Sequence, residues 1–187
     1  IKTSISYLSN TIEDFRSFLN KDKVLSNVNI NHLVQKVLDI LNPSLQSHHI
    51  EVIKNIDDFE FVTIENDLIQ ILMNIITNAK DALIDLKDEE ARYIFINISK
   101  NQKNIVIEIF DNAMGIKDEI ISRVFEPYFT TKHKSQGTGI GLYMSKILVD
   151  NNLKGNIAVE NHTFIYNNKE FKGAKFIILL PIKLEKK

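Results

Sequence analysis

Glycines occupy positions 137, 139 and 141, directly before an apolar run with helical spacing. Backbone N–H groups at the start of a helix are free to bind phosphate, and glycine lets the backbone approach a ligand closely. The spacing is not that of a Walker-type loop, because no Gly-Lys-Ser/Thr follows, nor is it the G-x-G-x-x-G pattern of dinucleotide-binding proteins. A loop that only caps the next helix would also contain such glycines, so this block alone does not decide.

Two asparagines, Asn74 and Asn78, lie four residues apart within a strongly apolar segment. That spacing places both amides on the same face of a helix. A neutral amide oxygen is a hard ligand suited to Mg²⁺, which takes waters and phosphate oxygens at its remaining positions. Alternatively, both amides hydrogen-bond neighbouring backbone, because polar groups at the edge of a core need partners.

An apolar run over 105–110 ends in Asp111, and Gly115 follows four residues later. A carboxylate at the end of a strand can accept a hydrogen bond from the amino group of a buried adenine, which would select this base. Glycine would let the backbone approach the ring. The other interpretation of this block is a turn with an Asp cap.

Between these blocks, Phe125 and Phe129 flank Pro127 and can anchor the underside of a loop. The basic run over 132–134 offers positive charge for phosphates, although it could also be a solvated cluster. The amide helix, the Asp111 block, the phenylalanine block and the glycine block, in this order, predict a nucleotide-binding site closed by a mobile loop.

The helices that must position these side chains can be read from hydrophobic periodicity. Asn31 is expected to cap the first helix, and Asn42-Pro43 is expected to end it. The charged run over 85–90 is expected to be a solvated loop after the second helix. Helices are predicted over residues 31–41, 68–86 and 142–150.

Two β-rich runs, 93–99 and 105–110, flank a polar five-residue segment and predict a hairpin. Isoleucines alternate along both runs, so each strand has one apolar face. Weak periodicity over 115–137 indicates a long functional loop rather than a linker. Helices on one face of a mixed sheet predict an α/β two-layer sandwich. Further strands are expected over 28–30, 50–53, 157–159 and 175–180, with a turn over 166–170 and Pro181 ending the last strand.

The composition is that of a globular domain: of 187 residues, 44% are apolar and 25% charged. One well-buried domain plus a short extra element fits this length. A net charge of −1 does not suggest a nucleic-acid partner, and the lack of cysteine excludes disulfides and thiolate chemistry. No apolar run approaches the roughly 20 residues of a membrane span, and no signal peptide is recognised. Because the chain begins with Ile1 rather than Met, we expect a fragment of a longer protein or a processed chain.

Apolar residues at positions 1, 5, 8, 12, 15 and 19 alternate spacings of four and three. This heptad pattern predicts a helix packed in a coiled coil or a helical hairpin, or else an amphipathic helix lying on its own domain. The polar segment 20–23 is the expected boundary. We therefore expect a helical segment over 1–22 and one domain over 23–187.

Together, these blocks resemble the N, G1, F and G2 boxes of the catalytic and ATP-binding domain of bacterial two-component sensor histidine kinases. This family belongs to the superfamily shared with gyrase, the Hsp90 chaperones and MutL. The similarity covers roughly residues 28–183. It implies a Bergerat fold, in which ATP lies between the sheet and a flexible lid. Residues 1–20 resemble the end of the second helix of the family's dimerisation and phosphoacceptor hairpin.

The resemblance implies roles for individual residues. Asn78 would hold Mg²⁺ with help from Asn74, and Asp111 would bind the adenine amino group. The segment 173–176 looks like the weaker glycine block that opens the final strand. The implied catalytic residues are Asn74 and Asn78, with Asn78 as metal ligand. The implied nucleotide-binding residues are Asn74, Asn78, Asp81, Asp111, Ala113, Gly115, Ile116, Phe125, Thr130, Thr131, Lys132, Gly137, Thr138, Gly139, Ile140, Gly141 and Leu142.

The chain also departs from the family pattern. Hydrolysing members carry a Glu base four residues before the metal-binding Asn, whereas this chain has Asn74, which favours a kinase. Ala113 replaces the first glycine of its block. Asp81 replaces a basic residue, so the phosphate contact from that position is lost and is expected to come from Lys132 or Lys134 instead. No phosphoacceptor motif follows any of the five histidines.

The resemblance implies a cytoplasmic sensor histidine kinase catalytic domain that binds ATP and Mg²⁺ and phosphorylates a histidine on a hairpin absent here. A response regulator would act downstream. A homodimer is expected for the full-length protein, and a monomer or weak dimer for this fragment. Two alternatives stay open: a Ser/Thr protein kinase of the same superfamily, and a nucleotide-dependent interaction module.

Overall fold

The computed structural model describes residues 24–87, 90–132 and 137–184. The predicted heptad helix, the boundary at 20–23, His133 and Lys134 lie outside these ranges. In chain order the elements are β1 (Ser26–Asn29), α2 (Ile30–Ser47), β2 (Ile50–Ile56), β3 (Glu60–Thr63), α3 (Glu65–Ile84), β4 (Arg92–Lys100), β5 (Asn104–Asp111), α4 (Asp118–Ile121), α5 (Gly141–Ile147), the π-helical turn η1 (Leu148–Asn152), β6 (Asn156–Tyr166) and β7 (Lys169–Pro181).

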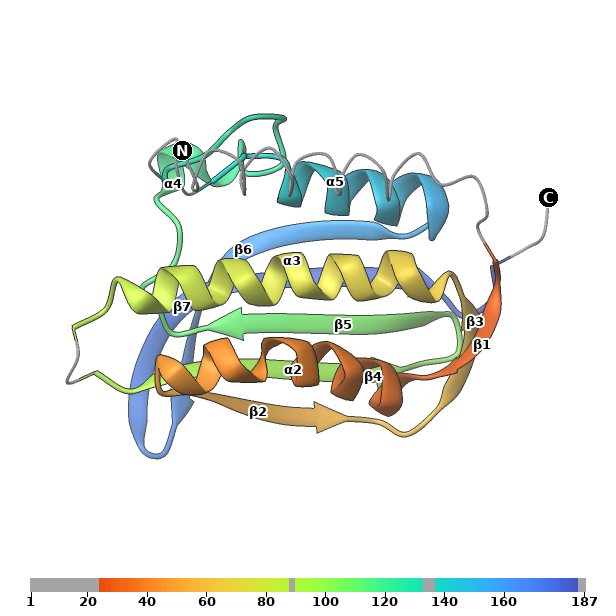
Figure 1. Cartoon of the computed structure of the whole chain (residues 1–187), viewed down its shortest axis with the longest axis horizontal. Coiled ribbons are helices and arrows are strands. Elements are labelled where there is room, and N and C mark those ends of the chain that lie inside the picture. The colour runs from red at the N-terminus through yellow and green to blue at the C-terminus, as the bar shows by residue number, and fades with distance from the viewer. Residues whose placement is uncertain (1–23, 88–89, 133–136, 185–187) are drawn as a thin grey trace.

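Five strands form a mixed sheet in the order β2-β4-β5-β7-β6. β2 and β4 are parallel, and the other neighbouring pairs are antiparallel. β1 and β3 form a separate small sheet. The helices α2, α3 and α5 all cover one face of the large sheet (Figure 1). The predicted α/β two-layer sandwich is therefore confirmed. No helix in the described ranges is long and apolar enough to span a membrane.

The core lies between α3 and the β4–β5 hairpin predicted from the sequence. Isoleucines alternate along both strands, and Ile96 pairs with Ile109 in the antiparallel register. The helix contributes a matching apolar face, which includes Ile71 and Ile75, both fully buried. Burying each such side chain contributes about 1.5–3 kcal/mol, so this packing fixes α3 over the sheet. Its polar face is thereby held next to the end of β5.

Aromatic side chains form a second layer on the face of the sheet opposite the helices. Phe95 and Phe110 stack at 4.7 Å between ring centroids, and Phe164 lies 5.0 Å from Phe110 with its ring nearly perpendicular. Offset and edge-on aromatic pairs contribute about 0.5–1.5 kcal/mol beyond their burial. These contacts hold the long β6–β7 hairpin against β4 and β5.

The predicted bounds of α2 were wrong at both ends. The N-cap is Asn29, whose side chain accepts from the backbone N–H of His32 at 3.1 Å, whereas Asn31 donates to Asp58. The helix continues through Pro43 to Ser47. A proline inside a helix removes one hydrogen bond, but burial of Leu45 offsets this loss, since only 3% of its surface is exposed.

The final hairpin is longer than the sequence suggested. β6 and β7 pair continuously from Asn156–Leu179 to Tyr166–Lys169, and their ladder keeps the polar stretch before residue 175 extended. Gly173 consequently lies in the middle of β7 and does not open it, which corrects the expectation. The predicted turn is present, with positive φ of 49° at Asn167 and 60° at Asn168. Two such residues suit the right-handed twist of a tight hairpin.

Candidate functional site

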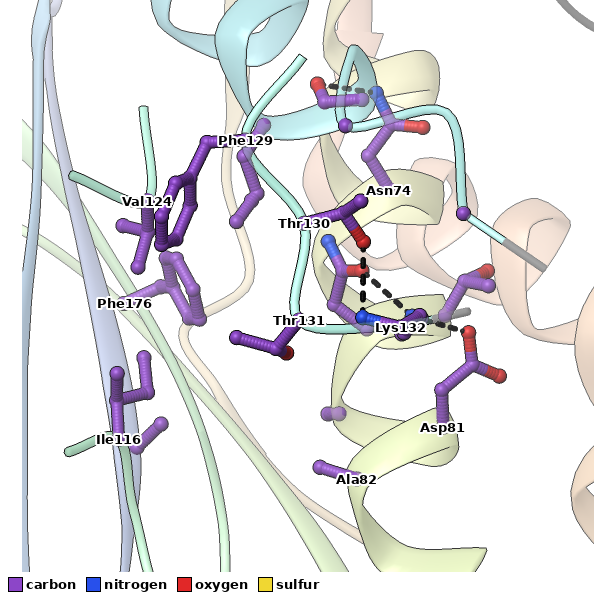
Figure 2. Close-up of a pocket in the computed structure, with 18 of the residues that line it drawn as sticks. Asn74, Asp81, Ala82, Ile116, Val124, Phe129, Thr130, Thr131, Lys132 and Phe176 are labelled. Atoms are coloured by element: carbon purple, nitrogen blue, oxygen red, sulfur yellow. Dashed lines mark hydrogen bonds and ion pairs between the residues drawn. The ribbon is translucent and has the colours of Figure 1, made fainter. Parts of the chain in front are cut away.

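A cavity of about 680 Å³ lies between α3, the loop after α4 and the strands β5 and β7. Figure 2 shows Asn74 and Asp81 of α3 on one side, with Ile116 and Phe176 on the other. Residues 130–132 run between the two sides. The predicted blocks, although up to 67 residues apart in sequence (Asn74 to Gly141), thus meet around one cavity.

Most of the residues proposed for the site line this cavity. They are Asn74, Asn78, Asp81, Asp111, Ile116, Thr130, Thr131, Lys132, Gly137, Thr138, Gly139, Gly141 and Leu142.

Four proposed residues, Ala113, Gly115, Phe125 and Ile140, lie behind this lining. The backbone N–H of Ala113 donates to Asp111, and Gly115 has a φ of +81°. The Phe125 ring packs edge-on against Phe176 at 6.3 Å, and Ile140 is buried. These residues shape the walls of the cavity without facing it.

Asp111 ends β5 and has only 3% of its surface exposed. Its Oδ1 accepts hydrogen bonds from the backbone N–H of Ala113 at 2.8 Å and of Ala174 at 3.3 Å. Burial raises the pKa of Asp111 to about 6, although these two hydrogen bonds act in the opposite direction. Within the described part of the chain, Oδ2 has no hydrogen-bond partner and is available to a ligand.

The glycine at position 173 makes this position of Asp111 possible. A Cβ there would collide with the backbone carbonyl of Asp111, so β5 and β7 can approach only with glycine at this point. This close approach is the physical reason for the weak glycine block noted in the sequence.

Asn74, which also lines the cavity, joins α3 to α5. Its Nδ2 donates to the backbone carbonyl of Gly141 and to Ser145 Oγ, each at 3.1 Å. The Ser145 hydroxyl donates in turn to the Gly141 carbonyl at 3.0 Å. The Asn74 side chain is therefore a neutral amide whose N–H groups are already hydrogen-bonded. A general base at this position would have to be a carboxylate.

A positive charge already lies next to the second amide. Lys132 Nζ is 2.7 Å from Asp81 Oδ2 and donates to Asn78 Oδ1 at 3.4 Å. Lys80 Nζ lies 3.1 Å from the other carboxylate oxygen, Asp81 Oδ1. The amide oxygen proposed as a metal ligand thus faces a cation in this structure, so its surroundings suit positive charge.

Glycine is required at position 139, where the glycine block touches the backbone of residues 128 and 129. Gly139 has a φ of +65°, and a Cβ there would collide with the backbone of Tyr128 and Phe129. The guanidinium group of Arg123 lies over the Phe129 ring, 4.6 Å from the ring centroid. The close packing of Gly139 on the backbone of Tyr128 and Phe129 holds the glycine block against the segment that carries Lys132.

Several lining residues were missed by the sequence analysis. Those on α3 follow from helical spacing around Asn74 and Asn78. Phe129, Ala174 and Phe176 belong to blocks that were recognised in the sequence, but these three residues were not assigned to the lining of the site. The missed residues are Met73, Thr77, Ala79, Ala82, Asp85, Ile120, Val124, Phe129, Ala174 and Phe176.

Asn161 of β6 was also missed, and it holds the wall from behind. Its Oδ1 accepts from the backbone N–H of Ile116 and its Nδ2 donates to the Ile116 carbonyl, both at 2.7 Å. A Cβ on Gly115 would collide with this amide. Because 45 residues separate Asn161 from Ile116, no local pattern could reveal the contact.

A family model described as histidine kinase-, DNA gyrase B-, and HSP90-like ATPase matches residues 63–184. Similar proteins include the two-component sensor PprA of Pseudomonas aeruginosa, 30% identical over 78% of this chain, and sporulation kinase E of Bacillus subtilis, 29% identical over 82%. The chain spans only 15% and 19% of the length of these two relatives.

Solved structures of similar fold include the catalytic domain of histidine kinase ThkA, with a TM-score of 0.71 and 23% identity. That match covers 86% of this chain and 99% of the other. Full-length ShkA in complex with AMPPNP matches with a TM-score of 0.73 and 21% identity, over 97% of this chain and 37% of the other. At these identities the likeness concerns the fold.

Proposed function

The chain belongs to the histidine kinase-, DNA gyrase B- and HSP90-like ATPase family, and we propose that it is the catalytic and ATP-binding domain of a two-component sensor histidine kinase. Membership of an ATPase family implies use of a nucleotide. In the proposed reaction the domain binds ATP with Mg²⁺ and transfers the γ-phosphate to a histidine on a separate hairpin. The observation that carries the proposal is that one cavity is lined by a buried carboxylate, Asp111, and also by an amide and a lysine, Asn78 and Lys132.

The Asp111 carboxylate suits adenine. Asp111 Oδ2 can accept from the exocyclic amino group, while Ile116 and Phe176 give the ring apolar surroundings. Guanine presents a carbonyl oxygen where adenine has its amino group, so two acceptors would face each other in a buried site. Leaving a buried polar group unpaired costs about 1–3 kcal/mol, and more for a charge. We therefore expect discrimination between ATP and GTP.

Other residues of the lining suit a triphosphate and a divalent cation. Asn78 offers an amide oxygen, Lys132 an ammonium group, and the loop over 137–141 a backbone that comes close to the cavity. Hard oxygen ligands and phosphates are the usual surroundings of Mg²⁺ in proteins. When bound, Mg²⁺ would neutralise charge on the phosphate oxygens. The residues present therefore fit Mg·ATP.

The neutral side chain at position 74 supports phosphoryl transfer in preference to hydrolysis. Asn74 cannot take a proton from water, and its amide N–H groups are already bound to Gly141 and Ser145. Phosphoryl transfer requires mainly positioning and charge neutralisation, and this cavity supplies both. The attacking group would then come from another element.

That element is proposed to be the phosphoacceptor hairpin of the complete protein. None of the histidines in the described ranges lines the cavity. His48 is hydrogen-bonded to the Ser44 carbonyl on α2, and His162 packs against Phe110 on the far face of the sheet. A downstream response regulator, a homodimeric parent and a cytoplasmic location of this domain belong to the same proposal.

Transfer of labelled γ-phosphate from ATP to a supplied histidine-bearing hairpin tests this function. Asp111→Asn should abolish labelling, while Asp39→Asn on the exposed face of α2 serves as the matched control. Acid-labile phosphate on the hairpin is the expected product, because phosphohistidine hydrolyses in acid. Acid-stable phosphate on a protein partner would favour a Ser/Thr kinase. Intact ATP binding without any transfer would favour an interaction module.

A further inference from the structure

Two oxygen atoms on neighbouring turns of α3 share one ammonium group. Lys132 Nζ lies 2.7 Å from Asp81 Oδ2 and 3.4 Å from Asn78 Oδ1. The side chains of the ion pair are only about one-third exposed, 32% for Lys132 and 29% for Asp81. A single cation position thus lies between the amide and the carboxylate, inside the cavity.

The two lysines around Asp81 differ in how they are held. Lys80 comes from α3 itself, contacts Asp81 Oδ1 and also donates to Ser44 Oγ of α2 at 3.4 Å. Its side chain is 18% exposed. Lys132 comes from the loop and contacts the other carboxylate oxygen. If Lys132 moves, Lys80 still balances part of the Asp81 charge, so Lys132 is the exchangeable partner.

From this geometry we infer that Asn78 and Asp81 form one cation site, and that the Lys132 ammonium and the metal of Mg·ATP are its alternative occupants. The inference rests on the proposed function and extends it, since it makes Asp81 a second residue of the metal site. A metal ion bound by the same two oxygens would lie next to the Lys132 ammonium group, and the two positive charges would repel each other. Entry of the metal therefore displaces Lys132 toward the phosphates.

The chemistry of the two oxygens supports this assignment. Mg²⁺ in nucleotide sites is held by one or two carboxylates or other hard oxygens together with substrate phosphates and waters. Asn78 alone supplies a neutral oxygen, whereas Asp81 adds a negative charge one turn further along the same helix. Without metal, the same negative charge would repel the triphosphate once Lys132 had left it.

Two substitutions separate this role from a simple ion pair. In Asp81→Asn, the gain in ATP affinity on adding Mg²⁺ should fall by about tenfold or more, because a metal-site oxygen loses its charge. ATP affinity without metal should stay equal or rise. In Lys132→Met, ATP affinity without metal should fall, while the gain on adding Mg²⁺ should increase.

The experiment is calorimetric titration of the whole chain with ATP, with and without Mg²⁺, for wild type, both variants and the control Asp39→Asn. Thermal unfolding establishes that each variant is folded. An unchanged or larger metal-dependent gain in Asp81→Asn would overturn the inference. If Asp81→Asn does not fold, an unchanged metal-dependent gain in Lys132→Met overturns it instead. Failure of the proposed function is distinct, since wild type would then bind no ATP under either condition.

Discussion

Replacing Asp111 by Asn should stabilise the protein while it removes nucleotide binding. Burial raises the pKa of Asp111 to about 6 from its usual value of 3.8, so the folded protein holds the charged form at a cost. At about 1.4 kcal/mol per pH unit, the difference between these values corresponds to about 3 kcal/mol. Asn is uncharged and keeps an oxygen that can accept from Ala113 and Ala174. Asp111→Asn should therefore raise the free energy of unfolding at pH 7 by up to about 3 kcal/mol.

The pH dependence has a definite sign. Because the pKa is higher in the folded state than in the unfolded state, the folded protein binds more protons between about pH 4 and pH 6. The free energy of unfolding of wild type, as far as Asp111 determines it, falls as the pH rises through this window. Above pH 6 the folded protein carries the full free-energy cost of burying the charged Asp111 carboxylate. The advantage of Asp111→Asn should therefore be largest at neutral pH and vanish near pH 4.

Chemical denaturation of wild type and Asp111→Asn across pH 4–8 measures this difference, with Asp39→Asn as the control at an exposed position. Fluorescence from tyrosine can follow the transition, since the chain contains five tyrosines and no tryptophan. A lower stability of Asp111→Asn than of wild type at pH 7, or a gain in stability that does not depend on pH, would contradict this prediction. Either result would mean that the carboxylate is not destabilised by burial.

Three further predictions concern the walls of the cavity. Gly139→Ala should weaken ATP binding and speed proteolytic cleavage of the loop, because a Cβ collides with the Phe129 backbone; unchanged cleavage and affinity would show that this contact does not hold the loop. Asn161→Ala should lower ATP affinity by about tenfold, since the Ile116 segment loses two hydrogen bonds; wild-type affinity in a titration would contradict the positioning role. Lowering the pH through 6 should weaken ATP binding as Asp111 takes up a proton; equal affinities at pH 5 and 7.5 would exclude the carboxylate as the base-binding group.

Local sequence patterns predicted the elements that bury an apolar face. The alternating isoleucines of β4 and β5 and the apolar stripe of α3 were identified because each pattern follows from the geometry of one element. The same local logic placed Asn74 and Asn78 on one face and Asp111 at the end of a strand. These side chains do line one cavity, but their roles toward a nucleotide stay predictions until binding is measured.

Contacts between distant segments could not be predicted in this way. The pairing of Lys132 with Asp81 spans 51 residues. The extension of β7 through Gly173 depends on its ladder with β6, and the helical residues after Pro43 depend on burial of Leu45. At Gly173 and Pro43, tertiary packing outweighs the local conformational preference of the residue.

Calorimetric titration of this chain with ATP and with GTP, both in the presence of Mg²⁺, decides whether the cavity is an adenine-nucleotide site. We predict that ATP binds and that Asp111→Asn binds neither nucleotide. GTP should bind wild type at least tenfold more weakly than ATP, because the lost pairing at Asp111 costs about 1.4 kcal/mol or more. Equal affinity for the two nucleotides, or ATP binding that survives Asp111→Asn, would contradict the assignment of the cavity as an adenine-nucleotide site.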